Sequence, residues 1–214
     1  MRRLGRQGWR AARFVAVDVE TTGLDPRRDE IVSFAAVPVE EGRVLASEAV
    51  RGLVRPSTPP PGSSVEIHGL RAADLEAAPP AEEALAPLVA VLTGRIPVAH
   101  GAWVERSFLA PRLRPLGFRL PRRILDTALL WRALCIQRGA GDPGWCTLSA
   151  VAGGLGLPVH RSHDAEGDAL TTAQAFLALA THLETGGQGS VGALAGARWQ
   201  VRAWRLWHGA GRRA

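Results

Sequence analysis

The stretch Phe14–Pro26, with the sequence FVAVDVETTGLDP, constrains the fold of this chain more than any other. Its apolar start leads into Asp18-Val19-Glu20, and Thr21-Thr22-Gly23 then ends the run, which is typical of a buried strand followed by a turn. Side chains alternate across a strand, so the Asp18 and Glu20 carboxylates point to the same face. Such a pair is costly to bury unless a positive charge lies between the two groups, and a divalent metal ion is the natural candidate. The alternative is a solvated strand end with two unrelated acids.

Composition indicates one globular domain with appendages. The 214 residues are 46% apolar, which is enough for a sizeable core. No apolar run approaches the roughly 18 residues that a membrane span needs, and no apolar segment of the secretory kind follows Arg6. Cys135 and Cys146 lack metal-ligand spacing, so we expect free thiols in a cytoplasmic protein.

The positive charge is concentrated at the two ends of the chain. Residues 1–13 and 198–214 contain ten arginines and no acid. The other 16 arginines stand against all 20 acids, which leaves residues 14–197 with a formal charge of −4. On a helical projection Arg198, Arg202 and Arg205 form a stripe of about 60°, with Trp199, Trp204 and Trp207 on the other side. Basic ends suggest contact with a polyanion such as nucleic acid; the alternative is that they are solvated and frayed.

The order of predicted elements indicates an α/β fold. A strand to about Glu20, a second over 30–39 and a third over 44–54, joined by tight turns, predict an antiparallel three-strand meander. Two short strands then alternate with helices, which predicts additional parallel strands in one mixed sheet flanked by helices. The short strands are expected at 96–99 and 123–125, and the helices at 81–92 (with a break or late start at Pro87), 103–109, 126–137, 147–155, 165–183 and 191–208. Residues 1–12 are interpreted as a loose basic lead-in, 13–184 as the main domain, and 185–214 as a linker and a basic Trp/Arg-rich helix.

Three distant segments contain residues that could complete a site with Asp18 and Glu20. Glu105 lies on the first turn of a helix that follows a short strand. His163 and Asp168 flank the start of the longest helix, so the loop histidine can face the acid on the first turn. Asp126 ends another strand. Each has a simpler interpretation, as a solvated acid, a surface histidine or a helix cap.

Together these segments resemble the DEDD superfamily of 3′–5′ exonucleases, in its histidine-bearing, DnaQ-like branch. FVAVDVETTGLDPRRDEIVSFAAV resembles the first motif of the family, VAHGAWVERSFL at Val98–Leu109 the second, and the five-residue spacing of His163 and Asp168 the third. IHGLRAADL, LDTALLWRAL and TLSAVAGGLGLP resemble the segments between the motifs. The resemblance covers about residues 13–183 and implies a ribonuclease H-like fold.

The second motif departs from the family pattern. The usual sequence is H-N-A-x-F-D, whereas this chain has His100-Gly-Ala-Trp-Val-Glu105, so that Gly101, Val104 and Glu105 replace Asn, Phe and Asp. Glu105 keeps the carboxylate with one additional methylene group. The change therefore puts the rate and the metal preference in question more than the activity itself.

The resemblance also implies a chemistry. Two divalent ions about 3.5–4 Å apart can stabilise the attacking and leaving oxygens of a displacement at phosphorus, and Mg²⁺ or Mn²⁺ prefers oxygen ligands. By resemblance Asp18, Glu20, Glu105 and Asp168 hold two such ions, and His163 accepts the proton of the attacking water. The resemblance assigns contacts with the nucleic acid to Thr21, Thr22, Gly23, His68, His100 and Asp126.

The predicted function is hydrolysis of terminal phosphodiester bonds of nucleic acid with a free 3′ end, on single-stranded DNA in a proofreading role, to nucleoside 5′-monophosphates. A DNA polymerase subunit is a possible partner, and no membrane is involved. One alternative is an RNA-trimming exonuclease of the RNase T or oligoribonuclease kind. An alternative of another class is a nucleic-acid or polymerase-binding module that has lost catalysis, which the change to Glu105 would explain.

Overall fold

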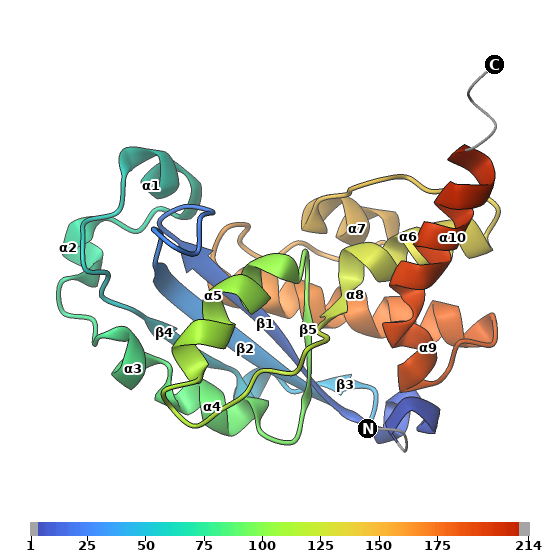
Figure 1. Ribbon diagram of the computed structural model, residues 1–214, viewed down its shortest axis with the longest axis horizontal. Coiled ribbons are helices and arrows are strands. Elements are labelled where there is room, and N and C mark those ends of the chain that lie inside the picture. Colours follow the sequence, from blue (N-terminus) through green and yellow to red (C-terminus); the bar gives the residue numbers. More distant parts are fainter. Residues whose placement is uncertain (1–3, 210–214) are drawn as a thin grey trace.

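The computed structural model describes residues 4–209, and it contains one mixed sheet with helices on both faces (Figure 1). Strand β1 pairs antiparallel with β2 and parallel with β5, and β5 pairs parallel with β6. The strands are β1 (Arg13–Thr21), β2 (Ile31–Glu40), β3 (Arg43–Val44), β4 (Val50–Leu53), β5 (Ile96–Ala99) and β6 (Leu125–Asp126). Their order is β3-β2-β1-β5-β6, and β4 also pairs with β2. The predicted mixed α/β sheet is confirmed.

The predicted third strand, 44–54, is wrong as a single element. It is divided into β3 and β4 by a 3₁₀ turn, Ala46–Glu48. The Leu45 N–H donates to Pro38 O at 2.9 Å, so Pro38 faces this edge of β2, where it has no N–H to offer. The chain therefore leaves the ladder and rejoins it at Val50. The preceding hairpin turn is as predicted, with positive φ values of 52° at Glu41 and 72° at Gly42.

The helices predicted from residue 81 onward are present, with two breaks, whereas the two short helices over 62–68 and 72–75 were not predicted. Pro87 lies at the start of α4, so the expected helix over 81–92 is two short ones. The expected final helix is interrupted at Gly196. The helices are α1 (Gly62–His68), α2 (Ala72–Leu75), α3 (Ala81–Ala84), α4 (Ala86–Leu92), α5 (Trp103–Leu113), α6 (Thr127–Gln137), α7 (Leu148–Gly154), α8 (Ala165–Thr185), α9 (Val191–Ala195) and α10 (Ala197–Gly209). Among residues 4–209, no helix has the length and apolar character required to cross a bilayer.

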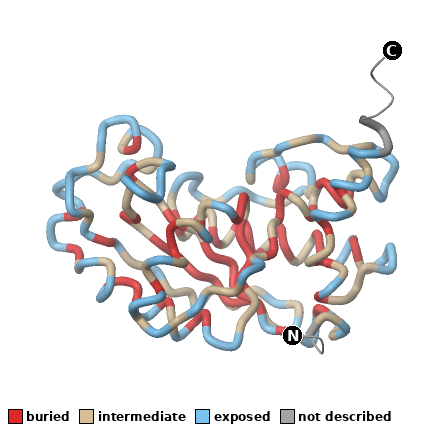
Figure 2. Tube along the Cα trace, viewed as in Figure 1, coloured by how far each residue is buried: buried red, intermediate tan, exposed pale blue. Residues whose placement is uncertain are grey.

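The two faces of β1 enter two separate cores. Val15, Val17 and Val19 pack with α4 and α5, whereas Phe14 and Ala16 pack with α6 and α8 on the other face. Figure 1 shows α8 on one side of the sheet and α4 and α5 on the other, and the buried residues follow the central strands in Figure 2. By the period of two, Asp18 and Glu20 continue the face of Phe14 and Ala16 toward α8.

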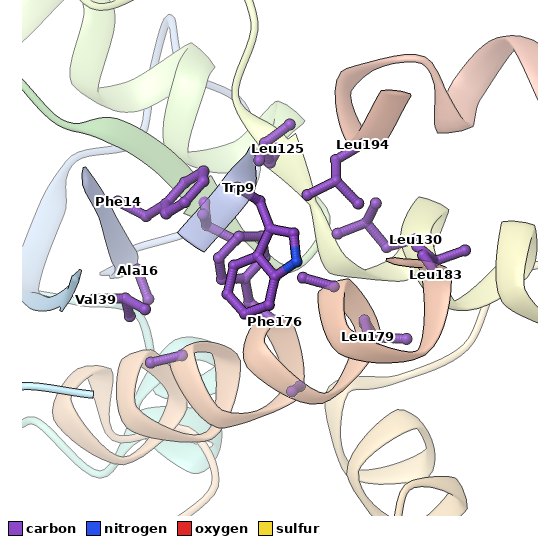
Figure 3. Close-up of a cluster of buried hydrophobic side chains, with 14 of the residues drawn as sticks. Trp9, Phe14, Ala16, Val39, Leu125, Leu130, Phe176, Leu179, Leu183 and Leu194 are labelled. Carbon is purple, nitrogen blue, oxygen red and sulfur yellow. The ribbon is translucent and has the colours of Figure 1, made fainter. Parts of the chain in front are cut away.

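The segment before β1 is not the loose lead-in that its charge suggests. Trp9 is only 2% exposed and packs edge-on against Phe176, with ring centroids 6.3 Å apart. The Trp9 backbone N–H donates to Gly189 O at 3.0 Å, and the Val191 backbone N–H donates to Gln7 O at 3.0 Å. Figure 3 shows Trp9 inside the core between Phe14, Leu194 and α8. Burial of this large ring anchors the segment, and the flanking Arg10 and Arg13 pair with Glu184 and Glu40.

Helix α10 packs on α6 through buried Ala197 and Val201. Its arginine stripe is partly engaged: Arg205 pairs with Asp142 at 2.8 Å. The guanidinium groups of Arg198 and Arg202 lie 4.7 and 5.6 Å from the ring centre of Trp199, which is 51% exposed. The side chain of Trp207 and the arginines at 2, 3, 212 and 213 lie outside the described residues.

Candidate active site

Three carboxylates meet where β1 leaves the core. Asp18 and Glu20 come from β1, and Asp168 comes from the first turn of α8. One oxygen from each lies within 4.8 Å of the others, and all three residues are partly buried. Helix α8 packs along β1 and β2, so its N-terminus brings Asp168 over the face predicted to carry the two acids. We call these residues the acidic trio.

The start of α8 explains the five-residue spacing between His163 and Asp168. The Asp164 carboxylate caps the helix by accepting from the Gly167 N–H at 3.0 Å. His163 has a φ of 61°, and its backbone N–H donates to the Asp168 carboxylate at 2.9 Å. At Gly167 a Cβ would lie 2.4 Å from Arg161 O, so only glycine lets the loop fold against the helix. The loop thereby joins His163 to the acidic trio, with the histidine side chain exposed.

Glu105 reaches the same region from the first turn of α5, beside the trio and outside its 4.8 Å set. It is 3% exposed, and its Oε2 has no hydrogen-bond partner among the described residues. Burial raises the pKa of this carboxyl to about 8, with further contributions from the charges of Asp126 and Glu20. A buried carboxylate with one unpartnered oxygen is a group that a cation would stabilise.

The pKa values of the three carboxyls in the trio are also raised. Burial, and then the charges of Glu105, Glu20 and Asp168, raise the pKa of Asp18 well above its usual range. Burial followed by the charges of Asp168 and Asp164 raises the pKa of Glu20 to about 7. Burial also raises the pKa of Asp168. Oxygen ligands with this excess of negative charge fit a hard divalent ion, and the cluster is able to bind one.

In the turn after β1, polar groups of Thr21 and Thr22 form hydrogen bonds within the turn itself. The Thr22 N–H donates to Glu30 O at 2.9 Å, and its hydroxyl accepts from the Glu30 N–H at 3.0 Å. The Thr21 hydroxyl donates to Gly23 O at 2.6 Å. A Cβ at Gly23 would lie 2.4 Å from the Asp29 carboxylate, so a larger residue would have to displace that side chain, which the Thr22 hydroxyl and the Asp25 backbone N–H hold in place. The backbone N–H of Thr22 is therefore engaged within the turn and is not offered to a ligand.

His100 and Asp126 are built into the scaffold of the second motif. His100 hydrogen-bonds through Nδ1 to the Thr127 hydroxyl and through Nε2 to Cys146 O, each at 2.9 Å. The Asp126 carboxylate accepts from the N–H groups of Gly101, Ala102 and Ala128, at 3.1, 3.2 and 2.9 Å. These bonds fix the start of α5 and, through it, the position of Glu105.

His68 lies at the end of α1 and is not part of the acidic trio. Its Nδ1 accepts from the Leu70 N–H at 3.1 Å, and its Nε2 is buried without a partner among the described atoms. Its contact with nucleic acid stays a prediction.

Trp145 is a site residue that the sequence reasoning did not identify. Its ring centre is 5.5 Å from that of His100, and it is 61% exposed. Gly101 has a φ of 74°, and a Cβ there would lie 2.7 Å from the Trp145 ring. The glycine that replaces the usual asparagine thus makes room for this ring. The sequence feature that could have identified Trp145 is its position directly after the Gly-rich loop 139–144.

Comparisons with known proteins agree with this geometry. Residues 15–176 match the sequence profile of the exonuclease family. A DNA polymerase III subunit epsilon-like protein of Rhodobacter capsulatus is 36% identical over 85% of this chain and 25% of its own length. The 3′–5′ exonuclease DinG of Bacillus subtilis is 31% identical over 77% of this chain and 17% of its own length. The chain thus spans a quarter or less of these relatives.

A solved structure of Exonuclease X in complex with 5′ overhanging duplex DNA shares the fold. Its TM-score is 0.64 at 24% identity, and the match covers 84% of this chain and 99% of that one. The predicted ribonuclease H-like architecture is confirmed by this likeness. From the profile match over residues 15–176, the chain belongs to the exonuclease family, as the DnaQ-like motifs predict.

Proposed function

We propose that this chain is a metal-dependent 3′–5′ exonuclease that hydrolyses the terminal phosphodiester bond of single-stranded DNA and releases nucleoside 5′-monophosphates. The acidic trio carries the proposal, because three carboxylates from β1 and α8 converge within 4.8 Å. Family membership supports the reaction class. Glu105 supports it further, because its Oε2 is buried without a hydrogen-bond partner among the described atoms.

Asp18, Glu20 and Asp168, together with Glu105, would hold two ions of Mg²⁺ or Mn²⁺. When bound, such ions supply charge stabilisation for the attacking and leaving oxygens. The chain itself supplies orientation: β1 and α8 hold the trio, and Asp126 holds the start of α5. His163 is exposed at the rim of the trio with its backbone fixed by Asp168, which suits it to accept the proton of the attacking water.

The test is incubation with 5′-labelled single-stranded DNA and RNA in Mg²⁺, Mn²⁺ or EDTA. We expect loss of 3′ nucleotides with either ion and none in EDTA. Asp18→Ala should abolish the activity, while Glu82→Ala, an exposed acid on α3, serves as the matched control. Absence of metal-dependent shortening of either substrate would contradict the proposal, and faster cleavage of RNA would favour the RNA-trimming alternative.

Glu105 defines a finer experiment on the same site. Glu105→Asp restores the usual acid of the motif and shortens the side chain by one methylene group. We expect a changed ratio of the rates in Mn²⁺ and Mg²⁺. An unchanged ratio would argue that Glu105 does not tune the ion site.

Association with a replicative DNA polymerase is a further part of the proposal. Its support is the likeness to a protein named as DNA polymerase III subunit epsilon-like. Co-purification of the chain with the polymerase subunit of its own organism, followed by size-exclusion chromatography, tests it. Separate elution at concentrations of about 10 μM would argue against a complex of micromolar or tighter affinity.

A further inference from the structure

A basic cavity of about 200 Å³ lies beside α5, outside the acidic trio. Its wall comes from the start of α5, the segment before β6, and the helices α9 and α10. The residues that define it are Trp103, Arg106, Arg122, Arg123, Asp126 and Arg198, and we call it the arginine cavity.

The cavity carries a net positive charge, because four arginines line it with one acid. Its one acid, Asp126, has both oxygens occupied by three backbone N–H groups. Arg122 and Arg123 are exposed, and their guanidinium groups form no ion pair with any residue between 4 and 209. Arg106 donates to Pro121 O and Arg122 O, at 3.0 and 2.7 Å, and pairs with no acid among the described residues. Four arginines thus converge in a protein whose body is otherwise slightly acidic.

The cavity and the acidic trio lie on different sides of one helix. At about 100° per residue, Trp103 and Arg106 are about 60° apart around α5, while Glu105 lies about 160° from Trp103. Glu105 faces the trio, whereas Trp103 and Arg106 line the cavity. All three residues fall within a single turn, so one polymer could contact both places.

Aromatic surface accompanies the charge. Trp103 is 51% exposed in the wall of the cavity, and Trp199, next to Arg198, is also 51% exposed. Arginines interleaved with exposed rings are typical of surfaces that bind single strands, where cations contact phosphates and rings stack on bases. A space of about 200 Å³ is below the roughly 300 Å³ of ordinary small-ligand sites, so it suits one phosphate or sugar unit of a longer chain.

We propose that the arginine cavity is a second contact for the nucleic-acid strand, in which Arg122, Arg123 and Arg198 bind the phosphate backbone and Trp103 stacks on a base. This inference rests on the proposed function for its ligand. The cavity supplies the attraction that the acidic trio opposes, and it holds the strand while its 3′ end is cleaved.

The test measures binding of a 5′-fluorescent oligothymidylate of about 20 nucleotides by anisotropy, in EDTA, at several salt concentrations. Each lost phosphate contact on a single strand changes the slope of log K against log[salt] by about 0.7. For Arg122→Ser/Arg123→Ser we expect a slope smaller by about 1.4 and, at about 0.1 M salt, binding weaker by about 25-fold. Trp103→Ala should weaken binding about fivefold or more at an unchanged slope.

The matched control is Arg114→Ser/Arg119→Ser, which removes two exposed, unpaired arginines beyond the other end of α5. This variant lowers the net charge by the same amount. If direct contact matters more than long-range attraction, its binding of the oligothymidylate should weaken by less than about twofold. Equal losses in both double variants, or wild-type binding in Arg122→Ser/Arg123→Ser, would overturn the inference; the second result would leave an acidic protein as the occupant to test.

A second readout separates this inference from the proposed function. Hydrolysis of a nitrophenyl ester of thymidine monophosphate requires the acidic trio and does not extend to the cavity. We expect wild-type hydrolysis of the ester by Arg122→Ser/Arg123→Ser, together with slower shortening of long strands. An inactive wild-type chain would remove the proposed function, whereas the binding measurement would still decide whether the cavity holds nucleic acid.

Discussion

Replacing Glu105 by glutamine should remove a large pH dependence from the stability of the metal-free protein. Burial, with the charges of Asp126 and Glu20, raises the pKa of Glu105 from 4.5 to about 8 on folding. Between these values the folded state keeps a proton that the unfolded chain has released, so the free energy of unfolding falls as the pH rises. At about 1.4 kcal/mol per pKa unit, this one group lowers the free energy of unfolding by about 3–4 kcal/mol between about pH 5 and pH 8.

The assay is urea unfolding of the wild type and Glu105→Gln in EDTA across this pH range. Glutamine cannot ionise, so the stability difference between variant and wild type should grow by about 3–4 kcal/mol from pH 5 to pH 8. Loss of the Glu105 charge also lowers the raised pKa of Asp18, and this further stabilises the variant relative to the wild type at high pH. Glu82→Gln on α3 is the matched control. A difference that stays constant within about 1 kcal/mol would refute the reasoning that Glu105 is a buried carboxyl forced to titrate.

Divalent ions should reverse the trend. An ion that binds only the folded protein stabilises it by about 2.7 kcal/mol at 100 times its Kd, and its ligands must be ionised. We therefore expect Mn²⁺ to raise the melting temperature of the wild type more at about pH 8 than at about pH 5, and to raise that of Glu105→Gln less. Equal shifts at both pH values would argue against binding by these carboxylates.

Three further outcomes test the scaffold. Trp9→Ala should lower the free energy of unfolding by about 3–5 kcal/mol in urea, because it empties a core position; a loss below about 1 kcal/mol would mean that the N-terminal segment is not part of the core. Gly101→Val should destabilise by about 1–3 kcal/mol through its positive φ and should displace Trp145, and unchanged urea midpoints would contradict this. Asp142→Ala leaves Arg132 unpaired and should cost about 3 kcal/mol at neutral pH, with faster tryptic cleavage of α10; a cleavage rate equal to that of the wild type would sink this expectation.

The pattern of β1 could be read locally because the two faces of a strand follow from a period of two residues. Phe14, Ala16, Asp18 and Glu20 had to share a face, whatever the rest of the chain did. Turn and helix breaks are equally local: Glu41-Gly42 adopts the left-handed values its hairpin needs, and Pro87 opens α4. Pro38 is a local signal that was not used, since its missing N–H explains why the third strand is interrupted.

Contacts between distant segments were decided only by the tertiary structure. Trp9 meets Phe176 across most of the chain, and no local period predicts that pairing. Competition for hydrogen bonds was likewise invisible in the sequence: His100 and Asp126 are residues of the kind that bind substrates, yet their polar atoms are engaged by Thr127, Cys146 and backbone N–H groups.

Residue types and spacing determined that carboxylates would gather at the end of β1, because strand alternation and helix start signals act over a few residues. The tertiary structure decided the rest of the site. It placed Asp168 within the trio and Glu105 beside it, buried and with its Oε2 unpartnered among the described residues, and it seated Trp145 over Gly101. Burial and the partner of each polar atom depend on which segments pack together, and this is a property of the whole chain.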